Sequence, residues 1–315
     1  MIRVLANSLV PIFAGLLLGY AAGLRKIVDN KDVKSLITFV MSFALPCSLF
    51  VTIARTPHHL LWSQGKVAVV LTIVYVAVFA LTHFAAQILG RDTAADSTVL
   101  ALTLGFPNAA AVGLPFLLAV YGPQASVAVA VSVTIGAITI SPITLAILES
   151  GTGAGKALST AARFRTSLWK AVKKPVVWAP VLGVLAVVID FDMPTYVDES
   201  LAILGSATAG TALFLTGLVV SAQRFNLNWS VGWSVFAKNF IQPALCLEAA
   251  RLASLPLEQT RYVVLISAIP CGFFGIVFGK GFNATPELAS SSLIASYVVG
   301  VFTLAAWIVL LSHLH

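Results

Sequence analysis

The sequence predicts an all-α polytopic membrane protein with ten transmembrane helices, arranged as two inverted repeats of five helices. Three observations support this prediction. The 315 residues are 59% hydrophobic and only 10% charged, the apolar residues form ten runs that suit a bilayer, and a basic segment divides these runs into two groups of five. A soluble domain carries about a quarter charged residues, so a soluble multidomain chain is excluded.

Ten segments approach the roughly 20 apolar residues that a membrane-spanning helix needs. We name them the first to the tenth span, and the sixth is short. The first span has no preceding basic region and no small-residue cleavage site, which indicates a retained helix and not a removed signal. In order, the spans are residues 4–24, 33–54, 66–89, 95–120, 123–148, 175–189, 200–220, 230–253, 258–279 and 286–311.

The positive charges lie unevenly between the two sets of loops. Thirteen lysines and arginines fall in one set, and five fall in the other set together with the termini. Cytoplasmic loops of membrane proteins carry the excess of lysine and arginine, so both termini are expected on the extracytoplasmic side. The net charge of +7 is interpreted as this orientation signal, and nucleic acid is not an expected partner.

The basic segment 149–174 is predicted to be the central cytoplasmic loop. It separates the first five-helix repeat, residues 1–148, from the second, residues 175–315. An odd number of spans in each half gives the halves opposite orientations, as in transporters with inverted repeats. A linker that sets the topology is the favoured interpretation of the loop, and binding of nucleic acid or lipid is the alternative.

The fourth span contains the most unusual stretch, residues 105–115, with two prolines, two glycines and Asn108 at mid-span. Proline breaks or kinks a helix, and freed backbone groups are tolerated at this depth only inside protein or beside a watery cavity. The stretch is therefore either a kinked packing helix or a discontinuous helix with a binding site. A matching break at Pro270 in the ninth span favours the second interpretation.

Broken helices of this kind suit an anion. The backbone N–H groups at the start of each second half carry partial positive charge, and an asparagine adds a neutral amide with donor and acceptor capacity. Lys238, in the eighth span, is a further candidate that either attracts the substrate or reaches back to the membrane surface. The predicted substrate-binding residues are Pro107, Asn108, Ala109, Gly113, Pro270, Cys271, Gly272 and Lys238.

The sequence contains no signature of an enzyme or of an ATP-driven pump. Phosphate-binding loops, zinc-protease motifs and nucleophile elbows are all missing from the 315 residues. No cofactor and no metal are expected, and the three cysteines, which lie in apolar spans, are interpreted as packing residues. Glu248 is expected to form an ion pair with Arg251 or Arg55.

Several segments together resemble the auxin efflux carrier family, including its bacterial malonate-transporter-like members. They are LVPIFAGLLLGY at 9–20, FALPCSLF at 43–50, GFPNAAAVGLP at 105–115 and ALFLTGL at 212–218. The resemblance implies broken helices 4 and 9 that cross, in a fold similar to that of the bile acid–sodium symporters. It also implies a scaffold domain and a transport domain, each drawn from both repeats, with the scaffold built from the first, second, sixth and seventh spans.

The resemblance implies transport of a small organic anion, a malonate-like mono- or dicarboxylate, by elevator-type alternating access in a bacterial inner membrane. The expected partners are this carboxylate and the lipid bilayer, and a homodimer is left open. Cys271 stands where an asparagine would complete the symmetry of the crossing, so the site differs from that of the plant carriers. Two alternatives remain: a sodium- or proton-coupled anion symporter of the bile-acid type, and a ligand-sensing membrane protein.

Overall fold

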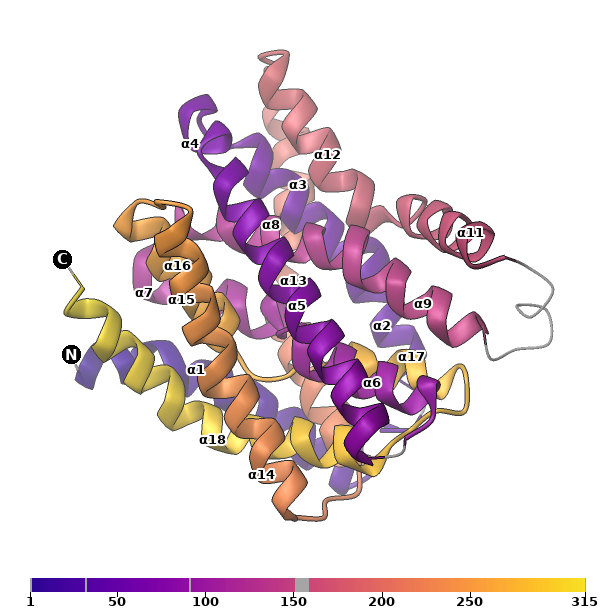
Figure 1. The fold of residues 1–315 in the computed structure, drawn as a ribbon. Coiled ribbons are helices and arrows are strands. Elements are labelled where there is room, and N and C mark those ends of the chain that lie inside the picture. The colour runs from indigo at the N-terminus through magenta and orange to yellow at the C-terminus, as the bar shows by residue number, and fades with distance from the viewer. Residues whose placement is uncertain (1, 32, 91, 151–158, 315) are drawn as a thin grey trace. The chain divides into compact units, whose positions relative to one another are not determined.

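The computed structural model describes residues 2–31, 33–90, 92–150 and 159–314, and this part of the chain is helical apart from its connections and one isolated bridge (Figure 1). The elements of the first half are α1 (Ile2–Leu24), α2 (Lys34–Phe39), η1 (Val40–Ala44), α3 (Leu45–Ala54), α4 (His58–Trp62), α5 (Gln64–Gly90), α6 (Ala94–Gly105), η2 (Ala109–Gly113), α7 (Leu114–Tyr121), α8 (Ala125–Ile135), η3 (Gly136–Ile140) and α9 (Ser141–Ser150). Those of the second half are α11 (Thr160–Val172), α12 (Pro175–Val188), α13 (Thr195–Ser221), α14 (Trp229–Phe236), η4 (Ala237–Ile241), α15 (Gln242–Leu252), α16 (Leu257–Ala268), α17 (Phe274–Lys280) and α18 (Glu287–Ser312).

Helix length and composition make the chain a multi-pass α-helical membrane protein. In the described residues, five helical stretches are long and apolar enough to cross a membrane: Lys34–Ala54, His58–Leu89, Ala125–Ser150, Thr195–Ser221 and Glu287–Ser312. Shorter apolar helices fall in the first, fourth and sixth spans, at Leu9–Leu24, Ala94–Gly105, Ala109–Tyr121 and Pro175–Val188. The fourth span is therefore divided into two helices, as its prolines predict.

Four wide helical turns, η1 to η4, share one cause. Each is a π-helical turn, and each is followed by a helix with proline at its second residue. Proline offers no N–H to the carbonyl four residues earlier, and its ring collides with that carbonyl. Widening the turn to an i→i+5 pattern relieves the collision without ending the helix. These prolines are Pro46, Pro115, Pro142 and Pro243.

The basic segment 149–174, predicted as a loop, contains the helix α11 in its second half. α11 packs against α9. The Lys170 ammonium lies 2.8 Å from the Glu149 carboxylate, and the Ser167 hydroxyl donates to the same carboxylate. The helix was missed because its basic composition hides an amphipathic pattern, whose apolar residues need a neighbouring helix before they can be buried.

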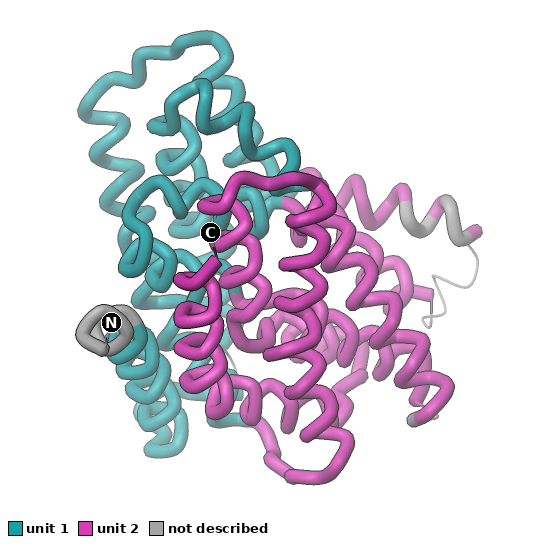
Figure 2. Tube along the Cα trace, turned by 60° about the vertical axis from the view of Figure 1, so that its left-hand side comes forward, with its two compact units in different colours: residues 1–68, 109–134, 173–222 teal, residues 69–108, 135–172, 223–315 magenta. Residues whose placement is uncertain are grey.

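The described chain divides into two compact units (Figure 2). Unit 1 comprises residues 1–68, 109–134 and 173–222. It contains the first, second, sixth and seventh spans, together with the second half of the fourth span and the first half of the fifth. Within it, α1 lies against α13 at Gly19 and Gly217, where a Cβ atom on either glycine would collide with the backbone of the other helix. Small residues at these two positions therefore let the two backbones approach.

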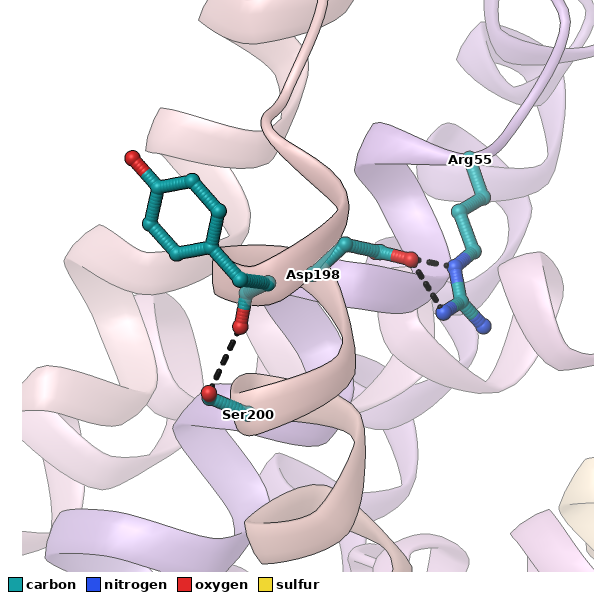
Figure 3. A network of polar contacts seen from close by, with 4 residues as sticks. Arg55, Asp198 and Ser200 are labelled. Carbon is teal, nitrogen blue, oxygen red and sulfur yellow. Dashed lines mark hydrogen bonds and ion pairs between the residues drawn. The ribbon is translucent and has the colours of Figure 1, made fainter.

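An ion pair joins α13 to the end of α3 within unit 1. The Arg55 guanidinium donates to both carboxylate oxygens of Asp198, with 3.0 Å between Nε and Oδ1 (Figure 3). This hydrogen bond to Asp198 raises the pKa of Arg55 above its ordinary value. The Arg55 side chain is about half exposed, so the pair lies at the surface.

Unit 2 comprises residues 69–108, 135–172 and 223–315. Its centre is formed by the two broken spans, because every residue from 97 to 108 and from 262 to 273 is buried. A helix that is buried on all sides has apolar residues on every face, and its sequence is therefore not amphipathic. α5, by contrast, exposes Ile73, Leu81 and Phe84 along one face, as expected of side chains that contact lipid.

Candidate functional site

The breaks of the fourth and ninth spans lie side by side within unit 2. Pro107 and Cys271 form an isolated antiparallel bridge. The N–H of Asn108 donates to the carbonyl of Pro270 at 3.1 Å, and the N–H of Gly272 donates to the carbonyl of Phe106 at 3.0 Å. Two short extended segments thus satisfy each other's backbone groups, as buried backbone must.

This pairing changes the expected source of hydrogen bonds to an anion. The N–H groups of Asn108 and Gly272 are donated to the opposite segment, and that of Cys271 is donated to the Ser296 hydroxyl at 3.1 Å. From the sequence alone, these N–H groups were expected to bind a ligand. In the structure they bond the other segment or α18, and these hydrogen bonds join the two breaks. The N–H groups without an intrahelical acceptor begin one step later, in the first turn of α17 at residues 273–276.

Asn108 presents its side chain to α18. Only 1% of the residue is exposed, and its Nδ2 donates to the hydroxyl of Tyr297 at 2.7 Å. Tyr297 is itself buried. The hydroxyl can donate onward while it accepts from the amide, so Asn108 and Tyr297 form a neutral polar pair beside the bridge.

Cys271 offers less side-chain chemistry on the other segment. It is fully buried, and its Sγ lies 3.9 Å from the carbonyl oxygen of Ser292 on α18. The hydroxyl of Ser292 is buried and has no hydrogen-bond partner among the described residues. The second break therefore contributes mainly its backbone, together with a small polar lining from α18.

Lys238 does not reach the membrane surface. It is 1% exposed, so the interpretation of a snorkelling anchor is wrong. The ammonium donates to the Gln242 side-chain oxygen and to the carbonyl of Ser267, both at 2.9 Å. The Gln242 amide in turn donates to the carbonyl of Gly105 at 2.9 Å. The eighth span thus contacts the end of the first half of each broken span.

Asn239 links the eighth and tenth spans. Pro243 cannot donate to the carbonyl four residues before it, which is that of Asn239, and the indole Nε1 of Trp307 donates to this carbonyl at 2.9 Å. The Asn239 side chain donates to the Ser296 carbonyl at 3.3 Å and to the Thr303 hydroxyl at 3.2 Å. α18 therefore supplies one donor to the backbone carbonyl that Pro243 cannot serve and two acceptors to the Asn239 side-chain amide.

The remaining predicted site residues lie elsewhere. Ala109 and Gly113 begin and end the π-helical turn η2, and both are buried within unit 1. The structure therefore brings together Pro107, Asn108, Pro270, Cys271 and Gly272. Lys238 lies in the same unit and bonds the carbonyl of Ser267, whereas Ala109 and Gly113 belong to the other unit. Their role in binding stays a prediction.

Sequence reasoning missed the face that α18 turns toward the crossing. The residues on it are polar, small or aromatic, and they recur every three or four positions in an otherwise apolar span. This spacing marks one side of a helix and was the signal that could have identified them. At the crossing these residues are Ser292, Ser296 and Gly300. Further along the same face, Thr303 and Trp307 bind Asn239. The neighbouring Tyr297 binds Asn108.

Outside the crossing, the charged side chains behave as surface groups. Arg251 pairs with Glu248 at 2.7 Å, which confirms the ion pair expected for Glu248, whereas Arg55 pairs with Asp198. His58 contacts Asp190 at 2.8 Å. The described residues contain no group of three or more histidine, cysteine, aspartate or glutamate side chains that could hold a metal ion.

Comparison with known proteins places this architecture among transporters. The model of a family described as membrane transport protein matches residues 4–308. The chain is 30% identical to the uncharacterized transporter YfdV of Escherichia coli K12, over 98% of both chains. It is 21% identical to auxin efflux carrier component 8 of Arabidopsis thaliana, over 97% of this chain and 96% of the relative. It is 24% identical to the lysosomal cholesterol signaling protein of Mus musculus, over 96% of this chain and 37% of that protein.

Proposed function

We propose that this chain, which belongs to the membrane transport protein family that includes the auxin efflux carriers, carries a small organic anion across the membrane at the crossing of its two broken spans. Membership of the family makes it a membrane transporter. The identity of the substrate as a malonate-like mono- or dicarboxylate, and the elevator mechanism, are the proposal.

One observation supports an anion above all. Lys238 is buried next to the crossing, and its hydrogen bonds go to a neutral amide and a backbone carbonyl. Among the described residues no aspartate, glutamate or arginine side chain is buried. A charged side chain inside a membrane protein pairs with another charged group or with backbone carbonyls, and by default it marks a substrate pathway. We infer that the positive charge of Lys238, which no carboxylate among the described residues offsets, attracts a substrate carboxylate toward the crossing.

The crossing suits a small and weakly held ligand. The Asn108–Tyr297 pair offers neutral hydrogen-bonding groups beside the bridge. Hydrogen bonds from neutral groups bind a carboxylate more weakly than a bidentate arginine does. Weak binding suits a carrier, because the substrate must also leave.

The division into two units supports an elevator mechanism. Both segments of the crossing lie within unit 2, together with Lys238 and α18, whereas the first, second, sixth and seventh spans lie in unit 1. We infer that unit 2 is the transport domain and that unit 1 is the scaffold. The proposed location is a bacterial inner membrane, with both termini outside the cytoplasm.

Uptake into liposomes tests the proposed function. We expect purified protein to give saturable uptake of radiolabelled malonate or a similar carboxylate, and Asn108→Ala to lower the rate at least about tenfold through lost contacts to substrate and to Tyr297. Asn226→Ala is the matched control, because Asn226 is exposed in the same unit. Uptake that is unsaturable for every carboxylate, or equal in wild type and Asn108→Ala, contradicts the proposal.

Ligand sensing is a second candidate, favoured by the likeness to a protein named for signaling. A sensor binds its ligand without releasing it on the other side. Counterflow separates the two functions: liposomes loaded with unlabelled carboxylate accelerate entry of the labelled compound only if the protein transports. Carboxylate binding without counterflow favours the sensor.

A further inference from the structure

The buried C-terminal ends of the first half of each broken span need partners for their carbonyl groups. The last carbonyl groups of a helix have no intrahelical partner and form the negative end of its dipole. α6 ends at Gly105 and α16 ends at Ala268. Both ends are buried in unit 2, away from bulk water, so their carbonyl oxygens need partners inside the protein.

Three of these carbonyl groups accept from backbone donors near the crossing. The carbonyl of Leu102 accepts from Phe106, that of Thr103 accepts from Gly272, and that of Ile266 accepts from Ile269. One carbonyl at each helix end instead accepts from a side chain of the eighth span. These are Gly105, which accepts from Gln242, and Ser267, which accepts from Lys238.

Lys238 and Gln242 act as one group. They lie on consecutive turns of the eighth span, where the π-helical turn η4 meets α15. The Gln242 oxygen accepts from the ammonium at 2.9 Å while its nitrogen donates to Gly105. The ammonium therefore bonds one helix end directly, at Ser267, and the other through the Gln242 amide, at Gly105. One positive charge thus lies close to both carbonyl ends.

The surroundings of this ammonium are those of a small hard cation. Its two hydrogen-bond partners are a backbone carbonyl oxygen and an amide oxygen, which are the ligand types that alkali and alkaline-earth ions use in proteins. No carboxylate among the described residues is buried beside it. The Lys238 ammonium therefore occupies a position where a free cation would otherwise neutralise the two helix ends.

We propose that Lys238 is a tethered cation that takes the place of a coupling ion and holds the half-helices α6 and α16 in register. It is a positioning residue: it acts on the crossing through the carbonyls of Ser267 and Gly105. The chain then needs no sodium ion to assemble its site, and the sodium-coupled alternative does not apply to it. Lys238 has this role in the substrate-free protein, whatever the substrate is.

Chemical rescue tests this proposal. Lys238→Ala removes the three outer methylene groups and the ammonium, which together correspond to n-propylammonium. In purified protein without carboxylate, we expect the variant to unfold at a lower temperature than wild type and n-propylammonium to raise its midpoint saturably. 1-Propanol, a neutral compound of similar size, should give no more than the small effect it has on wild type. Lys280→Ala, which removes an exposed lysine of the same unit, is the matched control and should show no rescue.

A second measurement compares salts on wild type and on Lys238→Ala. We expect the thermal midpoint of wild type to be the same in sodium, potassium and choline chloride at equal ionic strength, whereas a vacated ammonium site in Lys238→Ala should respond to sodium. Rescue by 1-propanol as strong as that by n-propylammonium, or a wild-type midpoint that rises saturably with sodium alone, overturns the proposal. If Lys238→Ala does not fold, the comparison of sodium, potassium and choline chloride on wild type still tests the proposal.

These outcomes are separate from those for the proposed function. The thermal measurements contain no carboxylate, so failure of malonate uptake leaves them unaffected. Where uptake is observed, we expect its rate to change less than about twofold when choline replaces sodium, and Lys238→Ala to lose at least about tenfold, because a charged hydrogen bond at the crossing is lost. Uptake that needs sodium overturns the tethered-cation role and leaves anion transport in place.

Discussion

The two breaks in unit 2 solve the same backbone problem with different residues. The fourth span breaks at Pro107 and places a polar side chain, Asn108, against Tyr297. The ninth span breaks at Pro270 and follows with a thiol and a glycine, which contribute mainly backbone contacts. The first break therefore supplies side-chain chemistry, and the second supplies close approach of the two backbones.

The largest effect is expected at Gly272, because the two backbones meet there. A Cβ atom on this residue would lie 2.5 Å from the Phe106 carbonyl oxygen, so Gly272→Ala must push the segments apart. We expect a loss of about 1–3 kcal/mol in stability, as for other overpacked sites, seen as a lower thermal midpoint. Gly232→Ala is the control: a Cβ there meets nothing within 4 Å, and in helix α14 it should be neutral or stabilising. Equal midpoints for the two variants would show that close approach at Gly272 is unimportant.

The next effect concerns the side chain of the first break. Tyr297→Phe removes the acceptor of the Asn108 amide while it keeps the ring that packs beside it. The loss of one buried hydrogen bond is worth about 1 kcal/mol, so we expect carboxylate affinity to fall about fivefold. The conservative change Tyr262→Phe, at another buried tyrosine of unit 2, shows what loss of a hydroxyl does elsewhere. An affinity unchanged by Tyr297→Phe separates Asn108 from the binding site.

The smallest effect is expected at Cys271. Its backbone N–H donation to Ser296 survives any substitution other than proline, and a thiol is a weak donor. Cys271→Ala should therefore change uptake less than about twofold. A loss as large as that of Asn108→Ala would show that both breaks supply side-chain chemistry, contrary to the comparison above.

The broken spans could be predicted because proline has local consequences. Pro107 and Pro270 lack an N–H wherever they lie, so their breaks at mid-span and the buried small residues around them follow from the sequence. Family membership, predicted from several short segments, is confirmed by the match over residues 4–308 and by the relatives. The polar character of Asn108 was equally visible.

The hydrogen-bond partners could not be predicted, because they come from distant parts of the chain. Lys238 lies eight or nine residues from the start of its span, where a lysine either snorkels or turns inward. The choice depends on whether a buried acceptor lies within reach, and that acceptor, the carbonyl of Ser267, is 29 positions away. The backbone N–H groups of Asn108 and Gly272, which the sequence assigned to an anion, instead bond the opposite broken span. No local sequence pattern connects these two segments.

Binding of a carboxylate to the wild-type protein tests whether the crossing is an anion site. A thermal-shift titration compares malonate and related mono- and dicarboxylates with their neutral amides, malonamide for malonate, because a ligand that binds the folded state raises its midpoint. We predict a saturable rise for at least one carboxylate, no rise for its amide, and a smaller rise in Asn108→Ala. Equal shifts for an acid and its amide, or no shift for any carboxylate, would contradict an anion site at the crossing.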